Sequence, residues 1–299
     1  MAGRIAGTAD WDARLSSTGS PVCAPDWLAL REPADAAARA PELVDRLRAH
    51  LPDIDGSLLV RDLGCGTGSL GRWLAPRLPG PQTWILHDRD PRLLGLAATG
   101  LPAVADDGTP VTVRTHEGDL TALTSAEIVG TSLVSASALL DLLTLDEVDG
   151  LAAACVDARC AALLTLTVTG SVTITPTDPL DAAFAAAFDA HQRRTVAGRR
   201  LLGPDAGAAA VDAFERRGAV VVTRPSPWRL DAAGPDSSDT AALIEEWLRG
   251  WIAAACDQQP DLDEVAGTYL HKRLDACADG ELRATVGHVD VLALLGGSR

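Results

Sequence analysis

Residues 60–69 of the chain read VRDLGCGTGS, an apolar stretch that runs directly into a cluster of glycines. The apolar run from Leu58 to Leu63 predicts a strand, and the pattern from Ser69 to Leu78 predicts a helix. Glycines at such a junction let backbone N–H groups come close to a ligand at the N-terminus of the helix, where a carboxylate or a phosphate binds well. We therefore expect a ligand site in this loop.

The alternation of strand and helix continues beyond this loop. Strands are predicted over residues 83–86, 111–117, 132–137 and 161–169, and helices separate most of them. The last of these strands is almost continuously apolar, as expected for a strand that is covered on both faces. A regular series of this kind predicts an α/β fold with a doubly wound, mostly parallel sheet of about seven strands.

The regular series ends near Gly170. The sequence then predicts a polar segment, helices over about 180–194 and 204–216, a strand at 219–223, a turn at 226–229, helices over about 240–257 and 261–278, and a last strand over 282–294. We expect a helical segment at 1–56 and one domain at 57–299, with helical insertions at about 170–215 and 224–281 that form a cap. Trp247 and Trp251 recur at helical spacing with other apolar residues, which favours a core stripe over a ligand platform.

Two cofactors fit the glycine cluster. Gly66, Gly68 and Gly71 satisfy the Gly-x-Gly-x-x-Gly pattern of dinucleotide sites, and Asp88 follows at the distance expected of a ribose-binding acid. Asp62 favours the other cofactor, because a carboxylate beside the loop repels a pyrophosphate but suits the ammonium of an amino-acid ligand. S-adenosylmethionine carries such an ammonium, together with a carboxylate, a ribose and an adenine.

Over about residues 57–169 the chain resembles the class I S-adenosylmethionine-dependent methyltransferases. Asp62–Gly68 is similar to the family's first motif, whose loop binds the methionine part of the cofactor, and Asp88 matches the acid that takes both ribose hydroxyls. Gly118–Leu120 matches the segment after the third strand, where the acid accepts from the adenine amino group. Val134–Asp141 resembles the fourth-strand segment that lies under the cofactor and opens into the active site. The resemblance implies a Rossmann-like methyltransferase sheet, S-adenosyl-L-methionine as cofactor and S-adenosyl-L-homocysteine as product.

The resemblance also implies which residues contact the cofactor: Asp62, Gly64, Cys65, Gly66, Gly68, Asp88, Arg89, Asp119, Leu120 and Ser137. To these we add Arg31, whose guanidinium is suited to bidentate binding of the methionine carboxylate. Two features depart from the family. Ser132 stands where the family often has an acid, and about 60 residues separate Thr223 from Leu282, where the family has a hairpin of its sixth and seventh strands.

Methyl transfer from a sulfonium is an in-line displacement that needs an aligned acceptor in a site closed to water. A hydroxyl or amine acceptor also needs a base. The candidates are Asp141 after the fourth strand, His191 at the end of a helix and His288 in the last strand. Each also has a plain structural explanation, as a helix N-terminal acid, a cation that complements a helix dipole and a paired core histidine, respectively.

Substrate contacts are expected from aromatic and cationic residues outside the cofactor motifs. Trp11 and Trp27 lie in the leading segment, which in similar enzymes closes over the cofactor or the acceptor. Trp228, Arg193 and Arg229 lie in the insertions, and the two arginines would either neutralise an acidic substrate or balance local carboxylates.

The composition restricts the class of partner. The formal net charge of −15 argues against nucleic acid and anionic membranes, and 4% aromatic residues are few for stacking single-stranded nucleic acid. The six cysteines include no Cys-x-x-Cys pair, so we expect free thiols and no metal. The absence of a signal-peptide pattern and of an apolar run of about 18 residues predicts a cytoplasmic protein, monomeric or homodimeric, with no membrane partner.

These patterns favour a methyltransferase (EC 2.1.1.-) of a bacterial small-molecule type, with an O or N acceptor rather than a C or S acceptor. Three alternatives stay open. The same core would serve RNA or protein modification, it would bind the cofactor without catalysis, or the glycine loop would hold a nicotinamide dinucleotide.

Overall fold

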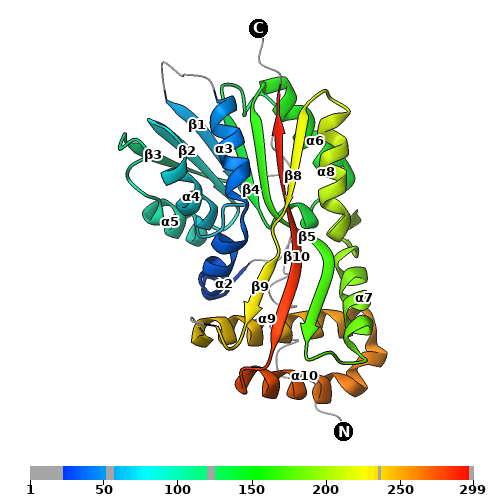
Figure 1. Ribbon diagram of the computed structural model, residues 1–299. Coiled ribbons are helices and arrows are strands. Elements are labelled where there is room, and N and C mark those ends of the chain that lie inside the picture. Colours follow the sequence, from blue (N-terminus) through cyan, green and yellow to red (C-terminus); the bar gives the residue numbers. More distant parts are fainter. Residues whose placement is uncertain (1–22, 52–56, 120–124, 235–236, 296–299) are drawn as a thin grey trace.

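The structure is a computed structural model that describes residues 23–51, 57–119, 125–234 and 237–295 (Figure 1). Its main feature is an eight-stranded sheet in the order β3-β2-β1-β4-β5-β10-β8, with β9 paired to β10. The strands are β1 (Leu58–Leu63), β2 (Gln82–Asp88), β3 (Val111–Glu117), β4 (Leu133–Ser137), β5 (Ala161–Thr175), β8 (Val220–Pro225), β9 (Trp228–Asp231) and β10 (Arg283–Leu294). A separate hairpin is formed by β6 (Thr195–Val196) and β7 (Arg199–Arg200).

The first five strands of this sheet run parallel to one another, and β10 runs antiparallel to β5 and to β8. The predicted doubly wound, mostly parallel sheet is therefore confirmed. Parallel strands require crossover connections, and helices supply them on both faces. The helices are α2 (Pro25–Ala38), α3 (Pro41–His50), α4 (Ser69–Leu74), α5 (Pro91–Gly100), α6 (Leu145–Ala158), α7 (Asp181–Gln192), α8 (Ala206–Glu215), α9 (Ser237–Gln258) and α10 (Asp263–Ala278).

Two apolar clusters cover the two faces of the parallel part of the sheet. Residues of α3, α4 and α5 pack on one face, and residues of α6 and α8 pack on the other. Neighbouring residues of β5 alternate between them, since Leu163 joins the first cluster and Leu164 the second. Burial on both faces explains why the first half of this strand is continuously apolar.

The chain differs from the prediction where β5 continues to Thr175, because residues 170–175 were expected to be a polar segment outside the sheet. Val172 and Ile174 point inward between exposed neighbours, which is the period-two pattern of a half-buried strand. The expected turn at residues 226–229 is likewise corrected, since Trp228 and Leu230 point inward from β9, which pairs with β10. Together the ends of β5, β10 and β9 form a three-stranded antiparallel extension of the sheet.

The extension carries a third apolar cluster of its own. This cluster joins the three strands of the extension to α7, α9 and α10. Figure 1 shows α9 and α10 crossing below the extension. The long insertion between β8 and β10 that the sequence predicted thus forms β9, α9 and α10. None of the helices in the described ranges is both long and apolar enough to cross a membrane.

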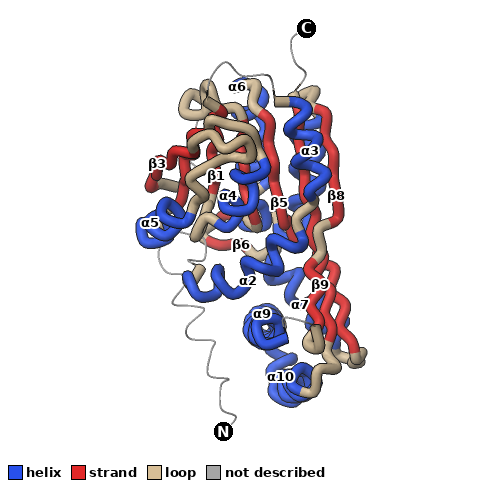
Figure 2. The backbone as a smooth tube through the Cα atoms, turned by 60° about the vertical axis from the view of Figure 1, so that its left-hand side comes forward, coloured by secondary structure: helices blue, strands red, loops and turns tan. Residues whose placement is uncertain are grey.

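The leading helices connect the two parts of the sheet. Figure 2 shows α2 between the parallel part and α9, and α2 contacts α4, β9 and α9. The buried carboxylate of Asp290 in β10 holds the junction between α2 and α3, because its Oδ2 accepts from the backbone N–H of Ala40 at 2.9 Å. Its Oδ1 accepts from the N–H of Leu166 at 2.8 Å and from Ser226 Oγ at 2.6 Å.

Candidate functional site

The glycine loop between β1 and α4 adopts a backbone that favours glycine. Gly64, Gly66 and Gly68 have φ values of +61°, +55° and +88°, in the left-handed region that other residues rarely adopt. A Cβ on Gly64 would lie 2.9 Å from Leu139 Cδ1, so this position also lacks space for a side chain. The predicted strand, loop and helix are confirmed, and the loop leaves backbone groups accessible at the end of β1.

A cavity of about 380 Å³, here called the glycine cleft, lies beside this loop at the carboxyl ends of the parallel strands. Ligands of open α/β sheets bind at this edge, where the strand order reverses between β1 and β4. The predicted cofactor residues that line the glycine cleft are Arg31, Asp62, Gly64, Cys65, Gly66, Asp88, Arg89, Asp119 and Ser137. Gly68 is placed instead as the N-cap of α4, outside the lining, and Leu120 lies outside the described residues.

Asp62 is the most deeply buried acid of the glycine cleft. Ser135 Oγ donates to its Oδ1 at 2.8 Å, whereas its Oδ2 has no hydrogen-bond partner in the described part of the chain. Burial raises the pKa of Asp62 to about 7, since a carboxylate without solvent is costly to ionise. A buried oxygen that lacks a partner indicates that a cation or a hydrogen-bond donor belongs beside it.

Arg39 is a cationic residue of the glycine cleft that the sequence analysis missed. It is 3% exposed, and its Nη2 donates to Ser69 Oγ at 3.2 Å and to Ser137 Oγ at 3.1 Å. Its Nε and Nη1 have no partner within the described ranges. Burial lowers the pKa of Arg39, while nearby carboxylates including Asp62 oppose that shift. The only signal in the sequence is an arginine at the end of an alanine-rich helix, just before Pro41.

Arg31 lines the glycine cleft, but its partner differs from the predicted carboxylate of a ligand. Its Nε and Nη2 donate to Asp35 Oδ2 and Oδ1 at 2.9 and 3.1 Å, and the guanidinium carbon lies 4.9 Å from the ring centroid of Trp228. The structure thus places Arg31 at the cleft, with a carboxylate of the chain as its partner. A guanidinium that already holds a carboxylate bidentately has its strongest donor pair occupied, which leaves Arg39 better suited to a carboxylate ligand.

Asp88 ties the loops of the glycine cleft together. Its Oδ2 accepts from the N–H of Gly66 at 2.9 Å, its Oδ1 accepts from the N–H of Asp90 at 3.0 Å, and its carbonyl accepts from the N–H of Gly118 at 3.1 Å. These bonds hold the loops after β1, β2 and β3 in one arrangement. Each carboxylate oxygen keeps lone-pair capacity for a further donor, such as a ligand hydroxyl.

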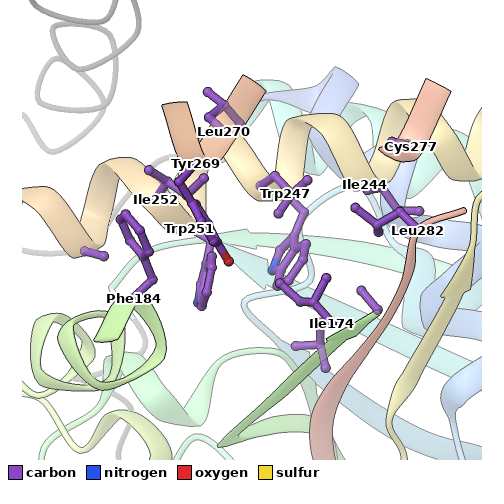
Figure 3. Packing of buried hydrophobic residues seen from close by; sticks show 14 of the residues in the cluster. Ile174, Phe184, Ile244, Trp247, Trp251, Ile252, Tyr269, Leu270, Cys277 and Leu282 are labelled. Atoms are coloured by element: carbon purple, nitrogen blue, oxygen red, sulfur yellow. The ribbon is translucent and has the colours of Figure 1, made fainter. Parts of the chain in front are cut away.

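A second cavity of about 220 Å³, here called the tryptophan cavity, adjoins the glycine cleft, because Leu142 lines both. It brings together three predicted residues, Trp27 of α2, Asp141 after β4 and His191 of α7. Trp247 and Trp251 of α9 form its far side; both are buried, which confirms the predicted core stripe, but they are walls of a cavity as well. In Figure 3 their indoles extend from α9 in the same direction, beside Phe184 of α7.

Burial shifts the pKa values of the two candidate bases in the tryptophan cavity in opposite directions. The Nδ1–H of His191 donates to the carbonyl of Ala254 at 2.8 Å, which leaves the lone pair on Nε2. Burial lowers the pKa of His191 to about 4, so the ring is neutral at pH 7. Burial raises the pKa of Asp141, and the fields of Arg31 and Arg194 oppose that shift. Asp141 therefore feels the charge of an arginine from each cavity, because Arg31 lines the glycine cleft and Arg194 lines the tryptophan cavity.

Four other predicted residues line neither the glycine cleft nor the tryptophan cavity. His288 is 6% exposed and its ring centroid lies 5.4 Å from that of Trp228; burial lowers its pKa to about 4, as for a core histidine. Trp228 is itself buried and its Nε1 donates to Asp35 Oδ1 at 2.9 Å. Arg193 is paired with Asp205 at 2.7 Å, and Arg229 is exposed on β9. Trp11 lies outside the described residues.

The hairpin β6–β7 is a further part of the glycine cleft that the sequence analysis missed. Ala197 and Arg199 line the cleft, and Arg199 Nη2 binds Glu147 Oε2 at 2.6 Å at the start of α6. Strands this short leave almost no hydrophobic pattern in the sequence. The turn between them is formed by Ala197 and Gly198, which both have positive φ, and a glycine at such a turn is the only sequence signal of the hairpin. Within the described ranges, no group of three or more His, Cys, Asp or Glu residues is placed to hold a metal ion.

Comparison with known proteins finds solved structures that are similar to this chain. No family model and no curated protein matches the chain. A cyclopropane synthase from Mycobacterium tuberculosis is 14% identical, with a TM-score of 0.47, over 96% of this chain and 98% of that one.

Two S-adenosylmethionine-dependent methyltransferases, both in complex with S-adenosyl-L-homocysteine, give similar values. The protein from Thiobacillus denitrificans is 17% identical over 91% of this chain and 99% of that one, with a TM-score of 0.44. The protein from Geobacter sulfurreducens is 16% identical over 90% and 98%, with a TM-score of 0.43. Such values carry no argument about activity, which has to rest on the site of this chain.

Proposed function

We propose that the chain is an S-adenosylmethionine-dependent methyltransferase that acts on a small molecule. The observation that carries the proposal is a pair of buried side chains in the glycine cleft, each of which keeps polar atoms without a hydrogen-bond partner in the described part of the chain. Asp62 offers an oxygen and Arg39 offers two nitrogens, and each lies in the electrostatic field of the other. The carboxylate of Asp62 matches the ammonium of an α-amino acid, and the guanidinium of Arg39 matches its carboxylate.

The rest of the glycine cleft fits the adenosine part of the same cofactor. Asp88 has capacity for ribose hydroxyls, and Gly118 and Asp119 line the cleft after the neighbouring strand, where an adenine edge would lie. A dinucleotide carries no ammonium, and its pyrophosphate would face the Asp62 carboxylate. The residues therefore fit S-adenosylmethionine better than NAD.

Bound in the glycine cleft, this cofactor supplies an electrophilic methyl group on a sulfonium. The chain's own residues bind the acceptor, orient it and exclude water. Asp141 lies at the boundary of the two cavities, and burial keeps its pKa raised, so its carboxylate is suited to hold a proton released by a hydroxyl or amine acceptor.

Two features support a small acceptor over RNA. The tryptophan cavity is a small concavity of about 220 Å³ rather than an extended surface that follows a polymer. Two of the four arginines in segment 193–200 are already neutralised, because Arg193 and Arg199 bind Asp205 and Glu147. The net charge of −15 further disfavours binding to a polyanion such as RNA.

Titration calorimetry of the full chain tests this proposal. We expect S-adenosyl-L-homocysteine to bind with one site per chain, and NAD to show no heat of binding under the same conditions. Binding of NAD without binding of S-adenosyl-L-homocysteine would overturn the proposal. Tight binding of a mixed-sequence RNA that falls steeply with added salt would overturn the choice of a small acceptor.

A further inference from the structure

The walls of the tryptophan cavity are aromatic. They come from Trp27 of α2, Phe188 of α7, and Trp247 and Trp251 of α9. The rings of Trp247 and Trp251 are stacked with centroids 5.5 Å apart, and Phe188 is tilted against Trp251 at 6.4 Å. Aromatic faces of this kind pack well against a flat apolar ring and attract a positive charge placed over them.

The polar lining of the tryptophan cavity consists mainly of hydrogen-bond acceptors. Carboxylates come from Asp141 and Glu246, and the neutral His191 presents Nε2 because its Nδ1–H is held by a backbone carbonyl. The side-chain oxygen of Gln192 is buried and has no partner in the described part of the chain. These groups call for a ligand that donates hydrogen bonds.

The charge of the lining favours a cationic ligand, which is also a hydrogen-bond donor. Arg194 is the one cation among the lining side chains that the structure describes, and it stands against the carboxylates of Asp141 and Glu246. Its Nη1 already donates to the carbonyl of His191 at 3.0 Å. An anionic ligand would therefore meet an excess of negative charge, whereas a cationic ligand would be attracted.

Trp251 carries a buried polar atom next to the tryptophan cavity. The residue is 2% exposed, and its indole Nε1–H finds no acceptor within the described ranges. A buried donor without a partner is costly, and the π face of an aromatic ligand ring offers it a weak acceptor.

We propose that the tryptophan cavity binds an amine carried on an aromatic ring, with the ring between the tryptophans and the ammonium toward the carboxylates of Asp141 and Glu246. That the bound amine is also the methyl acceptor rests on the function proposed above. The binding itself does not, because the cavity is lined without any residue of the glycine loop.

Three probes of the same size separate the chemistry of the ligand. Calorimetry of the full chain, with and without saturating S-adenosyl-L-homocysteine, compares 2-phenylethylamine, 2-phenylethanol and phenylacetate at pH 7. We expect the amine to bind tightest and phenylacetate to bind at least about tenfold more weakly. Equal affinity for the three probes, or tighter binding of phenylacetate, would overturn the proposal.

Neighbouring glutamates of α9 provide a matched pair of variants. Glu246 lines the tryptophan cavity, whereas Glu245 does not and lies 3.9 Å from Arg249. We expect Glu246→Gln to weaken binding of 2-phenylethylamine about fivefold and to leave 2-phenylethanol unchanged. Glu245→Gln should leave both unchanged, and equal effects of the two variants on the amine would contradict the proposed orientation.

Failure of this inference is distinguishable from failure of the proposed function. If S-adenosyl-L-homocysteine binds but the amine shows no preference over phenylacetate, the class of ligand is wrong and the methyltransferase proposal stands. If the amine binds as expected but S-adenosyl-L-homocysteine does not, the tryptophan cavity is an amine site and the proposed reaction is wrong.

Discussion

The glycine cleft and the tryptophan cavity share Leu142, yet they are built in different ways. The glycine cleft is formed mostly by loops at the carboxyl ends of parallel strands, and their positions follow from the pairing of the sheet. The tryptophan cavity is formed by side chains of α2, α7 and α9, which are held together by packing against the antiparallel extension. A site of the first kind depends on backbone conformation, and a site of the second kind depends on the volume of its side chains.

The largest effect is expected from a change to the packing under the tryptophan cavity. Phe184 is fully buried and stacks on Tyr269 with centroids 4.5 Å apart, beside Trp251. We expect Phe184→Ala to reduce the free energy of unfolding by about 3–5 kcal/mol and to weaken binding of 2-phenylethylamine. The affinity for S-adenosyl-L-homocysteine should stay within about twofold.

Phe214 of α8 is the matched control, since it is equally buried but packs against the parallel part of the sheet. Denaturant unfolding should show a similar loss of stability for Phe214→Ala, again about 3–5 kcal/mol. The two variants differ in ligand binding if the regions are separate, because only Phe184→Ala disturbs the amine. An equal loss of amine binding in both variants would show that the two regions are not separate.

A change to the backbone of the glycine cleft should weaken binding of S-adenosyl-L-homocysteine and leave binding of the amine unchanged, which is the reverse of the effect of Phe184→Ala. Gly66 has a φ of +55° in the loop that lines the cleft, whereas Gly108 has a φ of +78° at a turn with open space around it. Valine at either position should cost about 1–3 kcal/mol of stability through backbone strain. We expect only Gly66→Val to weaken S-adenosyl-L-homocysteine, by about 100-fold or more, because its side chain enters the cleft.

Calorimetry of both valine variants checks this expectation. Binding of 2-phenylethylamine should be unchanged in both, since neither glycine lines the tryptophan cavity. A similar affinity for S-adenosyl-L-homocysteine in the two variants would show that the glycine loop does not hold the ligand.

Arg39→Met tests the part of the glycine cleft that the sequence did not reveal. Loss of a charged hydrogen-bond donor to a buried carboxylate costs about 1.5–3 kcal/mol, so we expect S-adenosyl-L-homocysteine to bind roughly 10- to 150-fold more weakly. Binding of 5′-methylthioadenosine, which lacks the amino-acid part, should stay within about twofold. A parallel loss for both ligands would mean that Arg39 only supports the fold.

The smallest change is expected from titration of Asp62. Because burial raises its pKa to about 7, Asp62 holds a proton below that pH and offers an ammonium no negative partner. The affinity for S-adenosyl-L-homocysteine should therefore increase roughly 20-fold between pH 5.5 and pH 7.5. Asp62→Asn should remove this dependence, and 5′-methylthioadenosine should show none in either protein. A flat profile for the unmodified chain would contradict the role of Asp62.

The same difference between the two regions explains what the sequence could predict. The fold and most of the glycine cleft were predictable, because most strands of the parallel part are short apolar runs and residues such as Asp62 and Asp88 occupy one of the last two positions of a strand. Parallel strands bring their carboxyl ends to one edge, so local spacing is enough to place these residues together.

The tryptophan cavity was predicted only residue by residue. Trp27, His191 and Trp251 meet although more than 200 residues separate the first from the last, and no local pattern encodes that contact. Arg39 was missed for the same reason, since its environment is created by Ser69 and Ser137 from distant loops. The sequence could not tell whether Trp228 and His288 lie in a core or in a pocket, because an aromatic residue with a polar atom serves equally well in both, and the structure places both in buried positions.

The hydrogen bond from Ala40 to Asp290 spans 250 residues of the chain and has a consequence for synthesis. During translation the N-terminal residues leave the ribosome first, but the junction that positions Arg39 cannot be fixed until the last strand, β10, has been made. The glycine motif and the strand-end acids are all available long before that moment. A nascent chain that stops short of Asp290 therefore contains every cofactor motif that the sequence displays and still lacks the anchor that brings Arg39 into the cleft.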